Sequence, residues 1–329
     1  GAGIVGNSLV YHLANLGWTD IVQIDKGPLP NPGGSTGHAS NFIFPVDHNK
    51  EMASLTIDSQ NQYIELGVNT TCGAMEVART PERMQEFARR MTSSKSWGVD
   101  SVLLTPEEAV ELVPYMDKDV IVGAFYTPSG SVVDSLRAGT IMRERAQEMG
   151  ALQSFANTEV LDMVVEQGRI KAVVTDKGTI EAEYVVIATG LWGPKLAKVA
   201  GAEIPLSPTV HQMKDVGPVP RFLDSKGDIE YPIVRDMDTF MYERQHGTGL
   251  EIGSYAHRPI MYEPDDLPSN AQAALSPTEF PFTQSDFDLQ DEHALELMPE
   301  IVGDETVGEK YAINGLLSYT PDGMPILGE

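Results

Sequence analysis

The first six residues contain three glycines at the spacing of a dinucleotide-binding turn. Gly1, Gly3 and Gly6 fit a pattern in which glycine permits the tight turn, the approach of backbone to a pyrophosphate, and close packing of a helix. Residues 7–16 repeat apolar side chains at helical spacing, and residues 21–25 read as a strand that ends in an aspartate. Such a carboxylate can accept hydrogen bonds from a ribose. Together these features predict a dinucleotide site.

The segment that follows Asp25 favours FAD over a nicotinamide cofactor. Residues 26–40 are a long loop rich in glycine and proline, where a nicotinamide-binding unit usually enters its next helix within a few residues. Ser35 and Thr36 add hydroxyl and N–H donors to this loop. Residues 184–190 are predicted to form a second apolar strand that ends in a ligand-facing glycine turn. We expect the two segments to enclose FAD.

Four motifs spread over the whole chain resemble one family. The motifs are residues 25–29, 32–39, 253–259 and 319–323, and they are similar to those of dimethylglycine oxidase, dimethylglycine dehydrogenase and sarcosine dehydrogenase, within the D-amino-acid-oxidase-like superfamily. The resemblance implies FAD bonded covalently to the histidine of the Gly-Ser-Thr-x-His motif, which is His38. Histidine offers a neutral ring nitrogen near neutral pH. A His38 that only hydrogen-bonds its own loop is the alternative.

The resemblance also implies the remaining cofactor contacts and the reaction. The predicted cofactor set is Gly1, Gly3, Ile4, Val5, Gly6, Asp25, Lys26, Gly34, Ser35, Thr36, His38, Val160, Thr189, Gly190 and Trp192. The reaction is N-demethylation of a glycine derivative such as dimethylglycine or sarcosine, with hydride transfer from the methyl carbon to flavin N5. The resulting iminium is hydrolysed to formaldehyde or passed to tetrahydrofolate on a further C-terminal domain. Oxygen or an electron-transfer flavoprotein takes the electrons.

Two residues carry over as catalytic candidates, His211 and Tyr242. A protonated amine has no free lone pair to support C–H cleavage, so a group that removes or shares the proton raises the reactive fraction. A solvent-facing strand histidine and a packed core tyrosine are the respective alternatives. Arg258 is a candidate for the substrate carboxylate, with a surface ion pair as the equal alternative. Residues 39–44 depart from the glycine-containing pattern of dimethylglycine oxidase, which bears on the identity of the substrate.

The expected fold is α+β. A discontinuous, glutathione-reductase-like FAD domain is expected over residues 1–71, 134–203 and 303–329, interleaved with an antiparallel-sheet substrate domain over residues 72–133 and 204–302. Thr-Pro-Glu sequences at residues 80–82 and 105–107 predict two capped helices, and residues 257–284 predict a long excursion or lid.

Composition excludes several other functions. A formal charge of −25 argues against nucleic acid and anionic membrane surfaces, and no apolar run approaches the ~20 residues of a membrane span. The single cysteine, Cys72, excludes a disulfide framework. His48 and His293 lack partners at metal-ligand spacing, so no metal is expected. A cytoplasmic location is expected, or the mitochondrial matrix in a eukaryote.

The chain starts inside its first motif, so we expect it to be part of a longer protein and, without a strand before Gly1, to bind flavin poorly. Two other functions stay open. One is an oxidase of another secondary or tertiary amino acid, for example an N-methylated cyclic one. The other is a non-catalytic, flavin-fold regulatory subunit.

Overall fold

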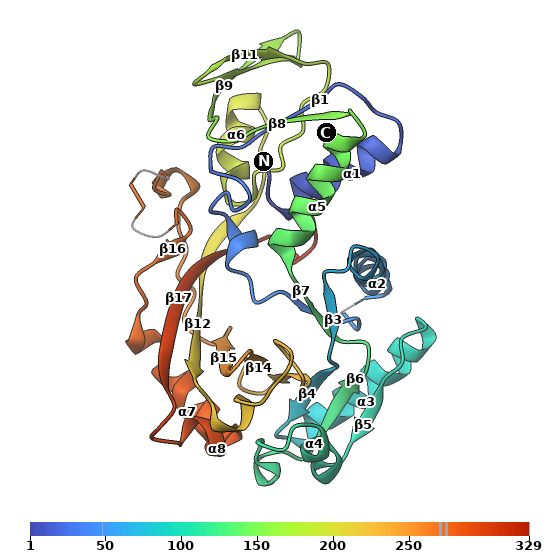
Figure 1. Ribbon diagram of the computed structural model, residues 1–329, viewed down its shortest axis with the longest axis vertical. Coiled ribbons are helices and arrows are strands. Elements are labelled where there is room, and N and C mark those ends of the chain that lie inside the picture. The colour runs from blue at the N-terminus through green and yellow to red at the C-terminus, as the bar shows by residue number, and fades with distance from the viewer. Residues whose placement is uncertain (48, 270–271, 274–275, 329) are drawn as a thin grey trace.

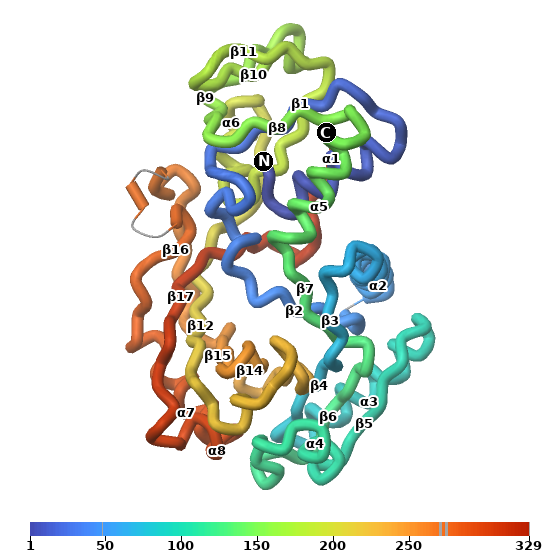
Figure 2. The backbone as a smooth tube through the Cα atoms, in the orientation of Figure 1, coloured from blue at the N-terminus to red at the C-terminus, as the bar shows by residue number. Residues whose placement is uncertain are grey.

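The computed structural model describes residues 1–47, 49–269, 272–273 and 276–328 and shows the α+β fold that the sequence predicts (Figure 1). Figure 2 shows that the chain passes repeatedly between the upper and lower parts of this view. The described helices are α1 (Ile4–Asn15), α2 (Lys50–Glu65), α3 (Pro81–Ser96), α4 (Pro106–Leu112), α5 (Ser135–Glu148), α6 (Gly193–Ala200), α7 (Asp288–Leu297) and α8 (Pro299–Val302).

The upper part contains the glycine turn and the elements that support it. Strand β1 (Ile21–Ile24) pairs in parallel with β8 (Leu152–Phe155), and α1 and α5 pack beside this pair around the buried Val10, Ala146 and Leu152. Helix α1 begins directly at the turn and ends before Gly17, whose φ of +89° suits the residue after a helix end. The predicted helix and strand after the glycines are therefore confirmed.

The predicted strand over residues 184–190 does not form. Residues 184–189 have no sheet partner within the described chain, and Tyr184 and Val186 are exposed. The apolar run is extended, but a strand also needs a neighbouring strand to accept and donate its backbone hydrogen bonds. The segment instead passes beside the glycine turn, since a Cβ placed on Gly1 would overlap the carbonyl oxygen of Ala188.

Two small sheets complete the upper and middle parts. Antiparallel strands β9 (Val160–Glu166), β10 (Arg169–Thr175) and β11 (Gly178–Glu181) form one at the top of the view. The second, in the order β2–β7–β3, consists of β2 (Phe42–Ile43), β7 (Ser131–Val133) and β3 (Asn69–Thr71). The second sheet therefore anchors the chain directly after the loop of residues 26–40.

A nine-stranded sheet dominates the lower part. Its order is β16–β17–β12–β15–β14–β13–β4–β6–β5, made of β16 (Glu279–Phe280), β17 (Gly308–Tyr319), β12 (Ser207–Gly217), β15 (Gly249–Ser254), β14 (Met241–His246), β13 (Ile233–Asp236), β4 (Ala74–Ala78), β6 (Gly123–Thr127) and β5 (Val102–Leu104). The described strand pairs of this sheet are antiparallel except for β4 and β13. These two strands are parallel, and a long crossover of the chain connects them. Buried Met75, Val77 and Ile252 belong to a core that this sheet shares with α4 and α7.

The two longest strands connect the parts. Strands β12 and β17 pair from Ser207 with Tyr319 to Gly217 with Gly308, and in Figure 1 they rise from the sheet towards the glycine turn. Residues of β17 thus lie in the large sheet although the sequence assigned residues 303–329 to the FAD domain. The domain boundaries remain a prediction.

The structure contains the two predicted helix caps and the predicted excursion. Thr80 and Thr105 accept hydrogen bonds from the first-turn N–H groups of α3 and α4, which confirms both capped helices. The excursion over residues 257–284 includes a short 3-10 helix at Pro264–Asp266 and returns through β16 to pair with β17.

Candidate functional site

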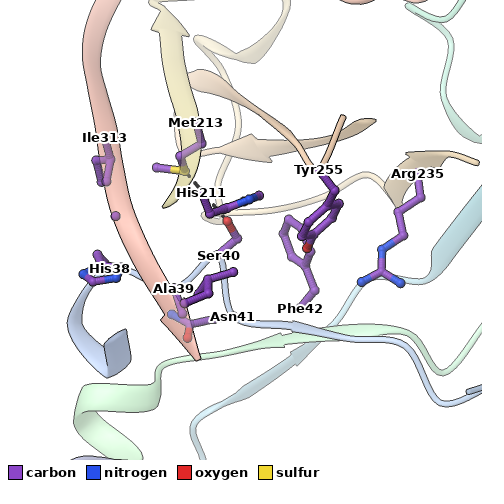
Figure 3. Close-up of a pocket in the computed structure, with 12 residues that line it drawn as sticks. His38, Ala39, Ser40, Asn41, Phe42, His211, Met213, Arg235, Tyr255 and Ile313 are labelled. Carbon is purple, nitrogen blue, oxygen red and sulfur yellow. Dashed lines mark hydrogen bonds between the residues drawn. The ribbon is translucent and has the colours of Figure 1, made fainter. Parts of the chain in front are cut away.

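A cavity of about 240 Å³ lies where β12, β13 and β17 meet the end of the loop of residues 26–40 (Figure 3). Its walls come from segments that are distant in the sequence. His38, Ser40 and Phe42 come from the loop and its continuation, His211 from β12, Arg235 from β13, and Tyr255 from the residue after β15.

The catalytic candidates His211 and Tyr242 are in direct contact. The distance from His211 Nε2 to the Tyr242 hydroxyl oxygen is 2.8 Å. The same hydroxyl lies 2.8 Å from Ser40 Oγ, so the three side chains form one hydrogen-bonded chain. The imidazole also stacks on Tyr255, with ring centroids 4.6 Å apart and an interplanar angle of 28°.

Burial keeps the His211 imidazole neutral. Desolvation, aided by the neighbouring His257 and His38, lowers the pKa of His211 to about 3. Its Nδ1 is buried without a hydrogen-bond partner in the described part of the chain. A neutral imidazole has one nitrogen free to accept a proton, so the side chain has the protonation state that a base requires. The alternative of a solvent-facing histidine does not apply.

Tyr242 is fully buried, which agrees with the alternative of a packed core tyrosine. Its hydroxyl nevertheless takes part in the hydrogen-bonded chain. A Cβ at Gly253 on the adjacent strand would overlap the Tyr242 ring, so only glycine leaves room for it. Burial raises the pKa of this phenol well above its usual value, so it remains protonated and can donate or accept a hydrogen bond.

Arg235 is a cavity residue that the sequence reasoning missed. Its guanidinium carbon lies 3.7 Å from the centroid of the Phe44 ring, and its Nε is buried with no hydrogen-bond partner among the described residues. Burial raises the pKa of Tyr255, and the nearby Arg235 guanidinium opposes that rise. In Figure 3 the Tyr255 ring lies between Arg235 and His211. Its strand pattern, Ile-Val-Arg-Asp, resembles no motif, so only the fold reveals the residue.

Arg258 lies elsewhere. Its Nε donates to Asp286 Oδ1 at 3.0 Å on an exposed surface, as in the alternative reading of an ordinary ion pair. The structure therefore brings Arg235, rather than Arg258, to the cavity.

The glycine turn has the shape of a cofactor cradle. A Cβ at Gly6 would overlap the Gly1 carbonyl oxygen, and Asp25 Oδ2 accepts a hydrogen bond of 2.7 Å from the Ala2 N–H. The Thr36 hydroxyl accepts one of 3.1 Å from the Ile4 N–H. Asp25 and Thr36, two residues of the predicted cofactor set, thus hold the loop and the strand before it against the glycine turn.

The remaining predicted cofactor positions surround this turn. Lys26 Nζ lies 3.9 Å above the Trp192 ring, and a Cβ at Gly34 would touch the same ring. Thr189 Oγ1 is buried with no partner in the described chain, as a group awaiting a ligand would be. Val160 opens β9, two residues after Thr158, whose N–H donates to the Asp25 carbonyl. The roles of these residues in holding FAD, and those of Gly190, Ser35 and Val5, remain predictions.

His38 lies at the junction of the turn and the cavity. Its side chain is only 4% exposed, its Nε2 lies 3.2 Å from the Leu316 carbonyl oxygen, and its Nδ1 lies 3.7 Å from Glu279 Oε1. A Cβ on Gly315 would lie 2.8 Å from the His38 ring, so the imidazole rests on the β17 backbone.

The other histidines lie away from the cavity or outside the described residues. His246 Nδ1 lies 2.6 Å from Asp215 Oδ2, away from the cavity, and His48 lies outside the described residues. Within the described residues, no group of His, Cys, Asp and Glu side chains could hold a metal ion, and no helix is long and apolar enough to cross a bilayer.

A family model for FAD dependent oxidoreductases (DAO) matches residues 1–329. The chain belongs to this family. It is 28% identical over 340 residues to mitochondrial dimethylglycine dehydrogenase of Rattus norvegicus and 28% identical over 341 residues to mitochondrial sarcosine dehydrogenase of Mus musculus. These alignments cover 100% of this chain but only 38% and 35% of the relatives, so the chain spans well under half of their length.

Among solved structures, L-proline dehydrogenase from P. horikoshii superposes with a TM-score of 0.84 at 25% identity, covering 100% of this chain and 83% of that one. The family resemblance and the FAD cofactor class that the motifs predict are therefore confirmed.

Proposed function

We propose that this FAD-dependent chain oxidises the N-methyl group of a glycine derivative such as dimethylglycine or sarcosine. The observation that carries the proposal is the cavity itself, which is lined by the neutral His211, hydrogen-bonded to Tyr242 behind it, and by Arg235, whose Nε has no partner among the described residues. An amino acid substrate carries one group for each: an amine that must lose its proton and a carboxylate that needs a cation. The names of the two dehydrogenase relatives support the same substrate class.

Arg235 is the proposed carboxylate anchor. A guanidinium can bind a carboxylate through two parallel N–H donors, which fixes the orientation of a small substrate. The Phe44 ring supports the guanidinium from one face, at 3.7 Å from its carbon to the ring centroid. A buried Nε without a partner is costly, and a bound carboxylate would satisfy it.

The His211–Tyr242–Ser40 chain is the proposed hydrogen-bond acceptor for the substrate amine. The buried imidazole is neutral at physiological pH and can accept a hydrogen bond from the substrate ammonium group, so that it shares the proton without becoming charged. The Tyr242 hydroxyl lies 2.8 Å from His211 Nε2 and orients the imidazole ring. The same hydroxyl is hydrogen-bonded to Ser40. Bound FAD supplies the acceptor for the hydride of the substrate C–H bond.

Finer parts of the proposal follow from the family resemblance. They are covalent attachment of FAD through His38, oxygen or an electron-transfer flavoprotein as electron acceptor, and a tetrahydrofolate-binding domain outside this chain. The His38 position at the cavity wall, beside Gly315, supports the first of these.

The test is a substrate panel under anaerobic conditions. We expect the flavin absorbance of the full-length protein to bleach with dimethylglycine or sarcosine, and to bleach much more slowly with dimethylaminoethanol, which keeps the methylated amine but lacks the carboxylate. Faster bleaching with proline or N-methylproline would move the assignment to a cyclic secondary or tertiary amino acid, in line with the L-proline dehydrogenase structure. No bleaching with any of these amines would leave the non-catalytic reading and overturn the proposal.

A further inference from the structure

The end of the excursion closes over the loop that carries His38. The hydroxyls of Ser276 and Thr278 both donate to the Gly33 carbonyl oxygen, at 3.2 and 3.0 Å. The next residue, Glu279, pairs with Gly315 in the β16–β17 ladder. The His38 imidazole rests on the same Gly315, so backbone pairing brings the Glu279 carboxylate to its edge.

The contacts of His38 place an acceptor oxygen beside each ring nitrogen. Nε2 lies 3.2 Å from the Leu316 carbonyl oxygen, which can only accept. Nδ1 lies 3.4 Å from Thr278 Oγ1 and 3.7 Å from Glu279 Oε1. The Thr278 hydroxyl hydrogen is already directed to Gly33, so its oxygen also faces Nδ1 as an acceptor. Both nitrogens therefore face acceptors.

An imidazole that forms a bond to carbon through one nitrogen stays neutral only if its other nitrogen gives up a hydrogen, so covalent attachment requires a group that takes a proton. Glu279 is the carboxylate that contacts the ring, and its side chain is 25% exposed, so it can exchange protons with solvent. The interaction with the His38 ring lowers the pKa of Glu279 below the usual value and keeps the carboxylate ionised.

We propose that Glu279 positions the His38 imidazole and accepts its proton when His38 becomes bonded to the flavin 8α-methyl carbon. The inference rests on the proposed covalent attachment at His38. A ring nitrogen gives its lone pair to the methyl carbon, and the methyl group loses a proton to solvent while its C–H electron pair passes into the flavin ring system. The imidazole proton goes to Glu279. Dioxygen then takes the two electrons from the reduced ring and is reduced to hydrogen peroxide.

Glu263 offers a matched control for Glu279. It lies in the same excursion and is exposed, and Glu263→Gln removes the same charge at a distance from His38. The titratable groups that face His38 are Glu279 from β16 and His211 across the cavity, so His211 is left unchanged in all variants.

The experiment follows covalent incorporation rather than turnover. Full-length flavin-free protein is mixed with FAD in air, samples are denatured at intervals, and the flavin fluorescence that stays with the polypeptide is measured. We expect Glu279→Gln to slow incorporation about 100-fold, the range typical of a lost proton acceptor. Glu279→Asp should recover part of the rate, and Glu263→Gln should match the unaltered protein. In Glu279→Gln the remaining rate should rise between pH 6 and 9, as solvent base replaces the carboxylate.

Each other outcome identifies what fails. If the unaltered protein retains no flavin after denaturation, covalent attachment itself is wrong. If the unaltered protein is labelled, His38→Ala is not, and Glu279→Gln is labelled at the full rate, then the attachment stands and the role of Glu279 is overturned. Reversible FAD binding, measured by fluorescence quenching, should be equal in Glu279→Gln and Glu263→Gln. Weaker binding only in Glu279→Gln would show that the residue merely holds the loop.

Discussion

The imidazole of His211 and the phenol of Tyr242 form one buried unit, joined by a 2.8 Å hydrogen bond between Nε2 and the hydroxyl oxygen. Two groups that act through one bond do not contribute independently to catalysis. We therefore expect His211→Asn and Tyr242→Phe each to slow anaerobic flavin reduction by about 10- to 100-fold, and the double variant to be little slower than the worse single variant. Stopped-flow absorbance measures this, and strictly multiplicative losses would show that the two residues act separately.

The neutral His211 makes stability sensitive to acid. Burial lowers its pKa to about 3, so between about pH 6.5 and 3 the unfolded chain binds a proton that the folded chain does not. Stability from this group therefore falls as the pH falls, by up to about 1.4 kcal/mol per pH unit. His211→Asn should be less stable at pH 7.5 but should lose less stability between pH 7.5 and pH 5 in urea titrations.

His246 supplies the control of opposite sign. The hydrogen bond with Asp215 raises the pKa of His246, so its stabilisation is present at low pH and is lost as the pH rises through that raised value. His246→Asn should accordingly enlarge the loss of stability on acidification. If both variants changed the pH dependence in the same direction, the charge states assigned to the two histidines would be wrong.

Arg235 and Arg258 form a matched pair for testing the carboxylate anchor. Arg235 lines the cavity with an unpaired Nε, whereas Arg258 is bound to Asp286 at the surface. Arg235→Gln should raise the KM for an amino acid substrate by about 10- to 100-fold, as expected for a lost hydrogen bond to a charged group. Arg258→Gln should stay within about twofold, because an exposed ion pair contributes little. Equal effects in steady-state assays would remove the distinction.

Gly253 is required by the Tyr242 ring. Its conversion to alanine would place a methyl group in the space of that ring, in a buried region of the sheet. Such overpacking typically costs about 1–3 kcal/mol, and here it should also slow flavin reduction by moving the hydroxyl. Gly227→Ala is the control, since a Cβ there meets no atom closer than 3.7 Å. Equal urea midpoints for the two variants would contradict the assigned packing.

The sequence predicted those parts of the fold that depend on local pattern. The glycine turn, the strand ending in Asp25 and the Thr105 cap are encoded within a few residues, and the structure contains all three. The prediction of a strand over residues 184–190 was wrong because strand formation depends on a partner from elsewhere in the chain.

The residues of the site likewise divide into those marked by local motifs and those placed by contacts with distant segments. His38 and His211 lie in recognisable motifs, whereas Arg235 and Ser40 gain their roles from residues far away. Arg235 acquires its setting from the approach of Phe44 and Tyr255, and Ser40 from a tyrosine 202 positions further along the chain. No local pattern in a single sequence marks such pairs.

Ser40 follows His38 by two residues, and its hydroxyl contacts Tyr242. The segment that is proposed to fasten FAD and the segment that begins the hydrogen-bond network are therefore the same short piece of backbone. A displacement at His38 cannot leave the hydroxyl of Ser40 where it was, because two peptide units give little slack. If FAD is attached at His38 as proposed, its attachment and the alignment of the His211 network are linked through these two peptide units, so a misplaced flavin would also displace the Ser40 hydroxyl.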